Sequence, residues 1–247
     1  MEHLKQLLDN AVKLTELEMQ IPGLERRCSE LREIAADRKT QRDWANLEAK
    51  NLEEPTFFQR LLGSVEKKQE RARAEAREAS AAYEEVKREL EGLEFQLRSL
   101  RETLEQFSGS RERYTGEKRT FLETSDDDQV QKLRELETEA YKPVAIELVK
   151  QIRKHLYSAR GWVQKDLQPR HFSRETCRME FIQLADDCAE KLQELLVFFP
   201  EGSVTLGASM SQPSSYINSV STNYSQIDLI NIAVEQSQRV QAQLEAL

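Results

Sequence analysis

The residues that could do chemistry are scattered, and none has the spacing of a familiar catalytic motif. A phosphate-binding loop needs two glycines with four residues between them, then Lys and Ser or Thr, because backbone amides must surround the phosphates. The nearest stretch, Gly109 to Thr120, has six residues between its two glycines and Glu117 immediately before Lys118. We therefore predict no phosphate-transfer site.

The sequence also contains no motif for a catalytic nucleophile or a metal site. No G-x-S-x-G motif is present, and no cysteine has a candidate base that its helix would present beside it. The three histidines, His3, His155 and His171, are scattered along the chain. Asp126 to Asp128 lack the alternating ligands and the glycine of a calcium loop, so we interpret them as a helix start. We expect no catalytic residue, no metal and no cofactor.

The cysteines predict buried thiols rather than a disulfide framework. Cys28, Cys177 and Cys188 form an odd set without a C-x-x-C motif. Cys177 and Cys188 are eleven residues apart, which on one helix separates them by roughly 16 Å, too far for a disulfide. We expect all three to be reduced thiols in the core.

The strongest pattern in the chain is a coiled-coil repeat. From Val65 to Phe107, seam positions recur in alternating steps of four and three, and charged residues fill most of the positions between them. At roughly 1.5 Å per residue such a helix is about 65 Å long, so its seam must be buried by other long helices. The seam positions are Val65, Gln69, Ala72, Ala76, Ala79, Tyr83, Val86, Leu90, Leu93, Leu97, Leu100, Leu104 and Phe107.

The first 52 residues supply a partner for this seam. An amphipathic helix over residues 1–21 meets a bend or break at Pro22-Gly23, and a second helix runs to Leu52 before Pro55. Folding about residue 58 pairs position i with a position near 117 − i, which places Ala45 against Ala72. The sequence therefore predicts an antiparallel coiled-coil hairpin over residues 1–107, with its tip at residues 53–64.

The second half of the chain predicts a helical bundle over residues 108–247 that packs on the base of the hairpin. Ser108 to Ser110 interrupt the long helix, and amphipathic helices follow. Their expected limits are a start at Ser125 to Asp128, a kink at Pro143, a loop bounded by Gly161 and Pro169, a Ser-rich loop at residues 200–225, and a final helix from Gln226. The predicted fold class is all-α.

Composition excludes two classes of function. The chain has 36 basic and 44 acidic residues in an interleaved pattern, with a formal charge of −8. A broad positive face for nucleic acid is therefore not expected. No apolar run approaches the 18 or so residues that a membrane span needs, so we expect a cytoplasmic protein.

The tip of the hairpin carries the candidate binding residues. Four large apolar side chains lie on one face of a short helical segment between Pro55 and Gly63. They either fold back and cap the seam or form a contact surface for another chain or a membrane. These residues are Phe57, Phe58, Leu61 and Leu62.

The tip sequence F-F-Q-R-L-L-G at residues 57–63, followed by Glu66 and Lys67, resembles an uncharacterised group of bacterial coiled-coil hairpin proteins with an F-F-x-x-L-x-G-x-x-E-K tip. Ala159, Trp162 and Asp166 match the A-x-x-W and the nearby aspartate of that group. The glycine-rich loop usual after the aspartate is replaced by Gln-Pro-Arg at residues 168–170. The resemblance implies a hairpin and a closing amphipathic helix, and it carries no activity.

The leading hypothesis is a non-enzymatic cytoplasmic scaffold or adaptor that uses its hairpin and apolar tip to bind another protein. The alternative is a peripheral membrane-associated hairpin similar in outline to phage-shock protein A, which the acidic charge disfavours. A third hypothesis is an enzyme of unfamiliar type that uses the segment from Trp162 to His171. The sequence does not identify the partner or the oligomeric state.

Overall fold

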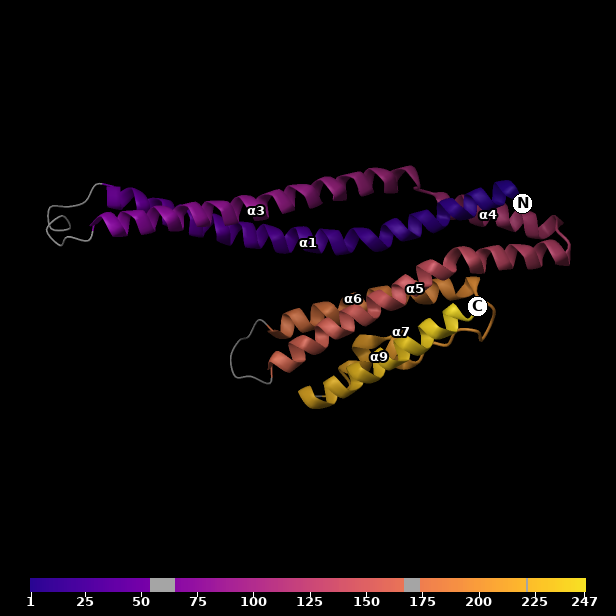
Figure 1. The fold of residues 1–247 in the computed structure, drawn as a ribbon. Helices are drawn as coiled ribbons and strands as arrows, with labels where there is room; N and C mark the ends of the chain where they lie inside the picture. Colours follow the sequence, from indigo (N-terminus) through magenta and orange to yellow (C-terminus); the bar gives the residue numbers. More distant parts are fainter. Residues whose placement is uncertain (54–64, 167–173, 221) are drawn as a thin grey trace. The chain divides into compact units, whose positions relative to one another are not determined.

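The computed structural model describes residues 1–53, 65–166, 174–220 and 222–247, and their regular structure is helical throughout (Figure 1). This confirms the all-α class. The elements in chain order are α1 (Glu2–Glu53), α3 (Val65–Gln106), α4 (Ser110–Thr124), α5 (Asp127–Asp166), α6 (Arg174–Leu195), the 3-10 turn η1 (Leu196–Phe198), α7 (Ala208–Ser211), α8 (Pro213–Ile217) and α9 (Asn223–Glu245).

The chain divides into two compact units. Unit 1 contains residues 1–19 and 107–247, and unit 2 contains residues 20–106. The sequence-based division instead assigned all of residues 1–107 to the hairpin. In the structure the first 19 residues, which form the start of α1, belong with the C-terminal helices.

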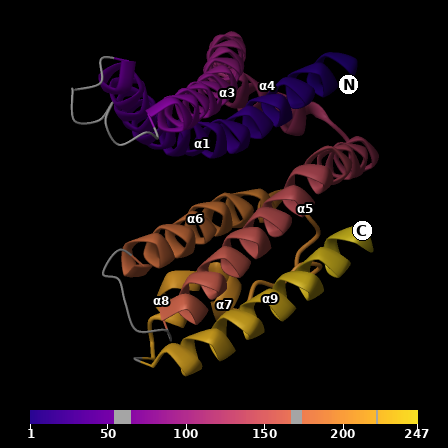
Figure 2. The ribbon, with the colours of Figure 1, turned by 60° about the vertical axis from the view of Figure 1, so that its left-hand side comes forward.

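Unit 1 is built around α5, which lies between α6 and α9 (Figures 1 and 2). Alanines without any solvent exposure lie on all three helices and allow their backbones to approach closely. Large side chains fill the remaining space and are also fully buried. The alanines are Ala145, Ala159, Ala185, Ala189 and Ala233, and the large side chains include Leu148, Ile152, Leu156, Ile182, Leu192 and Ile230.

The Ser-rich segment is more ordered than the loop that the sequence predicts. It contains α7 and α8, and both Met210 and Ile217 are fully buried in the unit 1 core. Pro213 opens α8 at a position where a missing N–H costs nothing. The next amide, that of Ser214, donates to Asp186 Oδ1 at 2.8 Å. Burial of the two apolar side chains explains why so polar a segment folds.

Most helix ends have the local chemistry expected of them. Gly109 has φ 72°, a left-handed conformation that glycine adopts without strain, and it separates α3 from α4. Asp126 caps α5, because its Oδ1 accepts from the amide of Gln129 at 2.8 Å. The loop predicted from Gly161 is wrong at its start, since α5 continues to Asp166.

Of the bend or break predicted at Pro22-Gly23, the break is wrong, because α1 runs without interruption through Pro22. A proline inside a helix leaves the carbonyl four residues earlier without its usual N–H donor. Here that carbonyl belongs to Glu18, and it accepts a hydrogen bond from Lys191 Nζ of α6 at 3.2 Å. The lysine thus replaces the donor that Pro22 lacks. The helix α5 likewise continues through Pro143.

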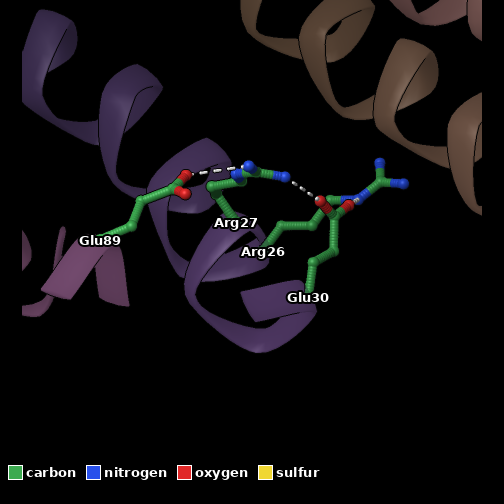
Figure 3. A network of polar contacts seen from close by, with 4 residues as sticks. All are labelled: Arg26, Arg27, Glu30 and Glu89. Carbon is green, nitrogen blue, oxygen red and sulfur yellow. Dashed lines mark hydrogen bonds and ion pairs between the residues drawn. The ribbon is translucent and has the colours of Figure 1, made fainter. Parts of the chain in front are cut away.

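Unit 2 has a small apolar core and several polar contacts between α1 and α3. Its buried apolar side chains are Ile21, Cys28, Leu31, Ala72, Ala76 and Leu97. Five partly buried leucines pack against Ile21, Cys28 and Leu97. Figure 3 shows one of the polar contacts, in which Arg27 of α1 donates to Glu89 of α3 at 2.9 Å and also to Glu30. Other contacts are Arg32 to Glu94, Arg101 to Glu25, Gln69 Nε2 to the Leu52 carbonyl, and the Arg42 guanidinium over the Tyr83 ring.

Two pairs of residues at helical spacing on α3 make other contacts. Arg88, four residues after Glu84, donates to the backbone carbonyl of Glu84. Glu94 lies four residues before Arg98, but its carboxylate accepts from Arg32 of α1. Arg32 therefore uses an acceptor that local spacing within α3 favours for Arg98.

The α1–α3 contacts run in opposite chain directions, and their register differs from the predicted one. For four of the five contacts the two residue numbers add up to between 121 and 126, whereas the sequence predicts 117. The Arg27–Glu89 contact has a lower sum. A seam that repeats every seven residues presents the same apolar face after a shift of one heptad. The periodicity therefore locates the seam but leaves neighbouring registers almost equivalent.

The first prediction separates these two registers. In a chain without native cysteines, the pair Ala45→Cys and Ala79→Cys should form a disulfide faster than the pair Ala45→Cys and Ala72→Cys. The first pair matches the observed register, and the second matches the one read from the sequence. Non-reducing electrophoresis under dilute oxidant measures the rates. Faster closure of the Ala45–Ala72 pair would contradict the structural register.

The second prediction concerns the carbonyl exposed by Pro22. Lys191→Met should lower the free energy of unfolding by about 1 kcal/mol, because the Glu18 carbonyl loses its donor. In a Pro22→Ala background the same change should cost much less, since the amide of residue 22 can then bond to that carbonyl. Urea denaturation of the four proteins gives the coupling energy. Equal costs in the two backgrounds would show that the lysine does not compensate for the proline.

Candidate functional site

The predicted tip residues, Phe57, Phe58, Leu61 and Leu62, lie outside the described residues. On the described part of unit 2, several large apolar side chains are exposed. Trp44 is 69% exposed and Phe95 is 69% exposed, and Leu47 is also open to solvent. Trp44 therefore does not pack in the core of unit 2. Unit 2 presents apolar side chains to solvent along its helices.

The two cysteines whose side chains the structure describes are covered thiols. Cys28 is fully buried, Cys188 is partly buried, and both are free thiols. Burial raises the pKa of the Cys188 thiol to about 11, and the thiol donates a weak hydrogen bond to Gln151 Oε1 at 3.7 Å. At neutral pH it therefore stays protonated and unreactive. The side chain of Cys177 lies outside the described residues.

A cavity of about 1010 Å³ opens in unit 1 between α4 and the C-terminal half of α6. We call it the α4–α6 groove. Seven side chains of α4 line it at the spacings of a single helix face, from Arg111 to Glu123. Five side chains of α6 line the other wall, from Asp187 to Leu195. Tyr141 of α5 and the residues Val197 and Phe198 of η1 complete the lining.

Polar contacts with α1 close one end of the groove. Arg111 donates to Glu18 Oε2 at 2.5 Å and to Thr15 Oγ1 at 3.0 Å. Lys191, on the opposite wall, donates to the Glu18 carbonyl. The Glu18 region therefore joins both walls, which fixes the spacing between α4 and α6 at this end.

A buried carboxylate holds α4 against α5. Glu137 is 3% exposed, and it accepts hydrogen bonds from the Tyr114 hydroxyl and from Lys118 Nζ, both at 2.5 Å. Burial, and then the bond to Glu137, raise the pKa of Tyr114 well above its usual range, so the phenol keeps its proton and donates. The Lys118 ammonium neutralises the carboxylate, which a buried charge requires.

Aromatic side chains extend this network into the lining of the groove. Tyr141 stacks on Phe198 with ring centroids 4.0 Å apart, and burial raises the pKa of Tyr141 to about 12. The ammonium of Lys118 lies 5.6 Å from the centroid of the same Phe198 ring. Thr138 donates to the Phe198 carbonyl at 2.8 Å, which holds η1 in place. The result is a fixed aromatic surface next to charged walls.

This arrangement suits binding better than acid–base catalysis. The carboxylate of Glu137 is already bonded to an ammonium and a phenol, and it is almost inaccessible to solvent. The groove around it offers a large volume, an aromatic surface and charged walls, which are the features of recognition sites.

Sequence reasoning missed this site, although one signal was available. Leu133, Glu137 and Tyr141 follow one another at four-residue steps on the buried face of α5. A charged residue in the middle of an apolar stripe needs a buried partner of opposite charge. That requirement indicates a neighbouring cation, but the sequence does not identify Lys118 as the residue that supplies it.

The residues that the structure describes contain no group of three or more His, Cys, Asp or Glu side chains placed to hold a metal ion. None of their helices combines the length and the apolar character needed to cross a lipid bilayer. In comparisons with protein-family models, curated proteins and solved structures, no match to this chain was found.

The third prediction tests the buried carboxylate. Glu137→Leu should lower the free energy of unfolding by about 1 to 3 kcal/mol, because it leaves the Tyr114 hydroxyl and the Lys118 ammonium without their acceptor. Adding Tyr114→Phe and Lys118→Met should recover most of that loss, since no unpaired polar group then remains.

Glu139→Leu, at an exposed position two residues further along α5, is the matched control and should change stability little. Chemical denaturation followed by circular dichroism measures all three proteins. A triple variant no more stable than Glu137→Leu alone would show that the unpaired Tyr114 hydroxyl and Lys118 ammonium do not cause the loss.

Proposed function

We propose that this chain is a non-enzymatic cytoplasmic scaffold or adaptor that binds another protein through the tip of a helical hairpin. In this proposal α1 and α3 of unit 2 form an antiparallel coiled coil, and Phe57, Phe58, Leu61 and Leu62 at the tip contact the partner. The observation that supports it most is the series of α1–α3 contacts, which extends from Gln69 and Leu52 near the tip to Arg101 and Glu25.

The small core of unit 2 also supports a display function. The part of α1 in unit 2, residues 20–53, is about 50 Å long at roughly 1.5 Å per residue. Ile21, Cys28 and Leu97 form a buried cluster, and Leu31, Ala72 and Ala76 are buried elsewhere along the helices. In this proposal the length of the helices serves to separate the tip from the other end of the unit.

The tip motif adds a further argument for the hairpin. Its F-F-x-x-L-x-G-x-x-E-K pattern at residues 57–67 is the basis for proposing kinship with the bacterial coiled-coil hairpin group named above. Four apolar residues in the segment of sequence between two charged helices favour a protein surface as their target.

A protein partner explains the charge better than a membrane does. With 44 acidic and 36 basic residues, the chain should be repelled by anionic lipid surfaces. An apolar tip on an acidic protein instead fits a hydrophobic pocket, where a few aromatic and aliphatic residues can supply most of the binding energy. Co-sedimentation with anionic and neutral vesicles separates the two possibilities, and binding to vesicles that depends on Phe58 would favour the membrane.

The fourth prediction tests the tip. Phe58→Ser with Leu62→Ser should abolish partner capture while leaving the melting temperature nearly unchanged, because few native contacts are lost. The matched control is Leu47→Ser with Phe95→Ser, which removes two exposed apolar side chains from the described helices and should leave capture intact. A photo-crosslinking residue at position 58, compared with one at position 95, identifies the contact directly in host cells.

Two outcomes would contradict the proposal. Early melting of the tip variant with undiminished capture would mean that the tip residues only cap the seam. Equal loss of capture in the tip and control variants would mean that exposed apolar area along the whole hairpin, rather than the tip, binds the partner.

A further inference from the structure

We propose that the α4–α6 groove of unit 1 binds an amphipathic α-helix of a partner protein, with an apolar ridge and a flank of Lys or Arg. This surface shares no residue with the tip, so it is a second binding surface beyond the proposed function. The argument rests on the length of the groove, its apolar lining and the distribution of its charges.

The dimensions of the groove match a helix. Its lining residues on α4 extend from Arg111 to Glu123, which is about 18 Å or three helical turns at roughly 1.5 Å per residue. Those on α6 extend from Asp187 to Leu195 and also occupy one helix face. Two helices that present open faces to the same groove are completed by a third helix that packs between them.

Apolar side chains in the groove are poorly covered by the chain itself. Val197 is 77% exposed and Leu122 is 41% exposed. Both adjoin Phe198, whose ring is held by its stack on Tyr141. Fixed and partly exposed apolar side chains of this kind are suitable contacts for the ridge of an incoming helix, because little order must be gained on binding.

A second cavity continues the groove. It has a volume of about 950 Å³ and shares Lys118, Leu122, Val197 and Phe198 with the first. It extends along the start of α5 to Phe199 and Pro200. The two cavities together form a continuous surface on both sides of η1, longer than a small molecule requires.

The charges that line the groove indicate which charges the partner helix should carry. On the α4 wall, Arg111 is paired with Glu18 and Lys118 with Glu137, so their charges are already compensated. Arg119 and Glu123, also on that wall, carry opposite charges. On the α6 wall, the carboxylates of Asp187, Glu190 and Glu194 form no ion pair with the residues that the structure describes, and Lys191 supplies the one positive charge among the α6 lining residues. The α6 wall therefore carries an excess of negative charge, which favours a helix with Lys or Arg on that flank.

The test uses the full chain and two synthetic 18-residue helical peptides labelled with fluorescein. Both carry leucines at helical spacing, and their flanks carry Lys in one peptide and Glu in the other. The Lys peptide should bind at least tenfold more tightly by fluorescence anisotropy. Glu190→Lys with Glu194→Lys should reverse this preference, and Val197→Asp should weaken binding of the Lys peptide at least tenfold.

The control has the same change in net charge away from the groove. Glu180→Lys with Glu235→Lys alters two exposed acidic residues on α6 and α9 that do not line it, and it should leave the preference unchanged. The tip variant should also bind the Lys peptide normally, so this test fails or succeeds independently of the tip.

Three results would overturn the proposal. One is equal affinity of the wild-type chain for both peptides, or no binding to either. Another is a loss in the control as large as in the groove variant, which would indicate attraction by net charge alone. The third is a dimer in sedimentation velocity that Val197→Asp converts to a monomer, which would assign the groove to a second copy of the chain.

Discussion

The structure of unit 1 depends on the burial of α5 on two sides. Its alanines and large aliphatic residues contact both α6 and α9, so neither outer helix has to pack against the other to bury its apolar face. Polar contacts between α5 and α9 fix how the two helices are aligned. Arg153 donates to Ser237 Oγ at 2.9 Å and to Gln241, and Arg160 donates to Asn231 at 2.9 Å. The arginines fix how α9 lies along α5, which apolar burial alone leaves undetermined.

The apolar periodicity predicts the helices well but predicts their pairing less well. The repeat from Val65 to Phe107 predicted α3 almost to its last residue, because seven-residue spacing is an intrinsic property of a helical seam. The same regularity makes registers one heptad apart nearly equivalent in apolar burial. The observed contacts of Arg32 with Glu94 and Arg101 with Glu25 lie outside the seam. Charged residues therefore decide between registers that the apolar residues cannot distinguish.

Pro22 shows why a correct local rule gives a wrong boundary. The rule that proline removes a backbone donor holds, but its consequence depends on what lies next to the exposed carbonyl. Lys191 is 173 positions away in the sequence, and it donates to that carbonyl. Nothing near Pro22 indicates this. Long-range compensation of backbone groups is therefore a part of the fold that sequence patterns miss, whereas caps such as Asp126 are local and were predicted.

The two candidate surfaces differ in how visible they are in sequence. The tip stands out because large apolar residues interrupt two charged helices, and a short stretch of sequence contains all of them. The groove is lined by residues of α1, α4, α5, α6 and η1. In the sequence, the acidic residues of its α6 wall have the pattern of an ordinary solvent-exposed helix face. Glu190 and Glu194 become candidate contacts only because two cations of the facing helix, Arg111 and Lys118, are already paired with Glu18 and Glu137.

The two units also differ in what stabilises them, and this difference bears on function. Unit 2 has few buried apolar side chains, which are Ile21, Cys28, Leu31, Ala72, Ala76 and Leu97, and ion pairs such as Arg27–Glu89, whose side chains are 47% and 49% exposed. Exposed pairs of this kind contribute between almost nothing and about 1 kcal/mol each. Unit 1 instead buries a continuous core of fully covered side chains. Local opening should therefore begin in unit 2. In the proposed function, such opening lets α1 and α3 adjust their pairing to a partner while the helices of unit 1 remain folded.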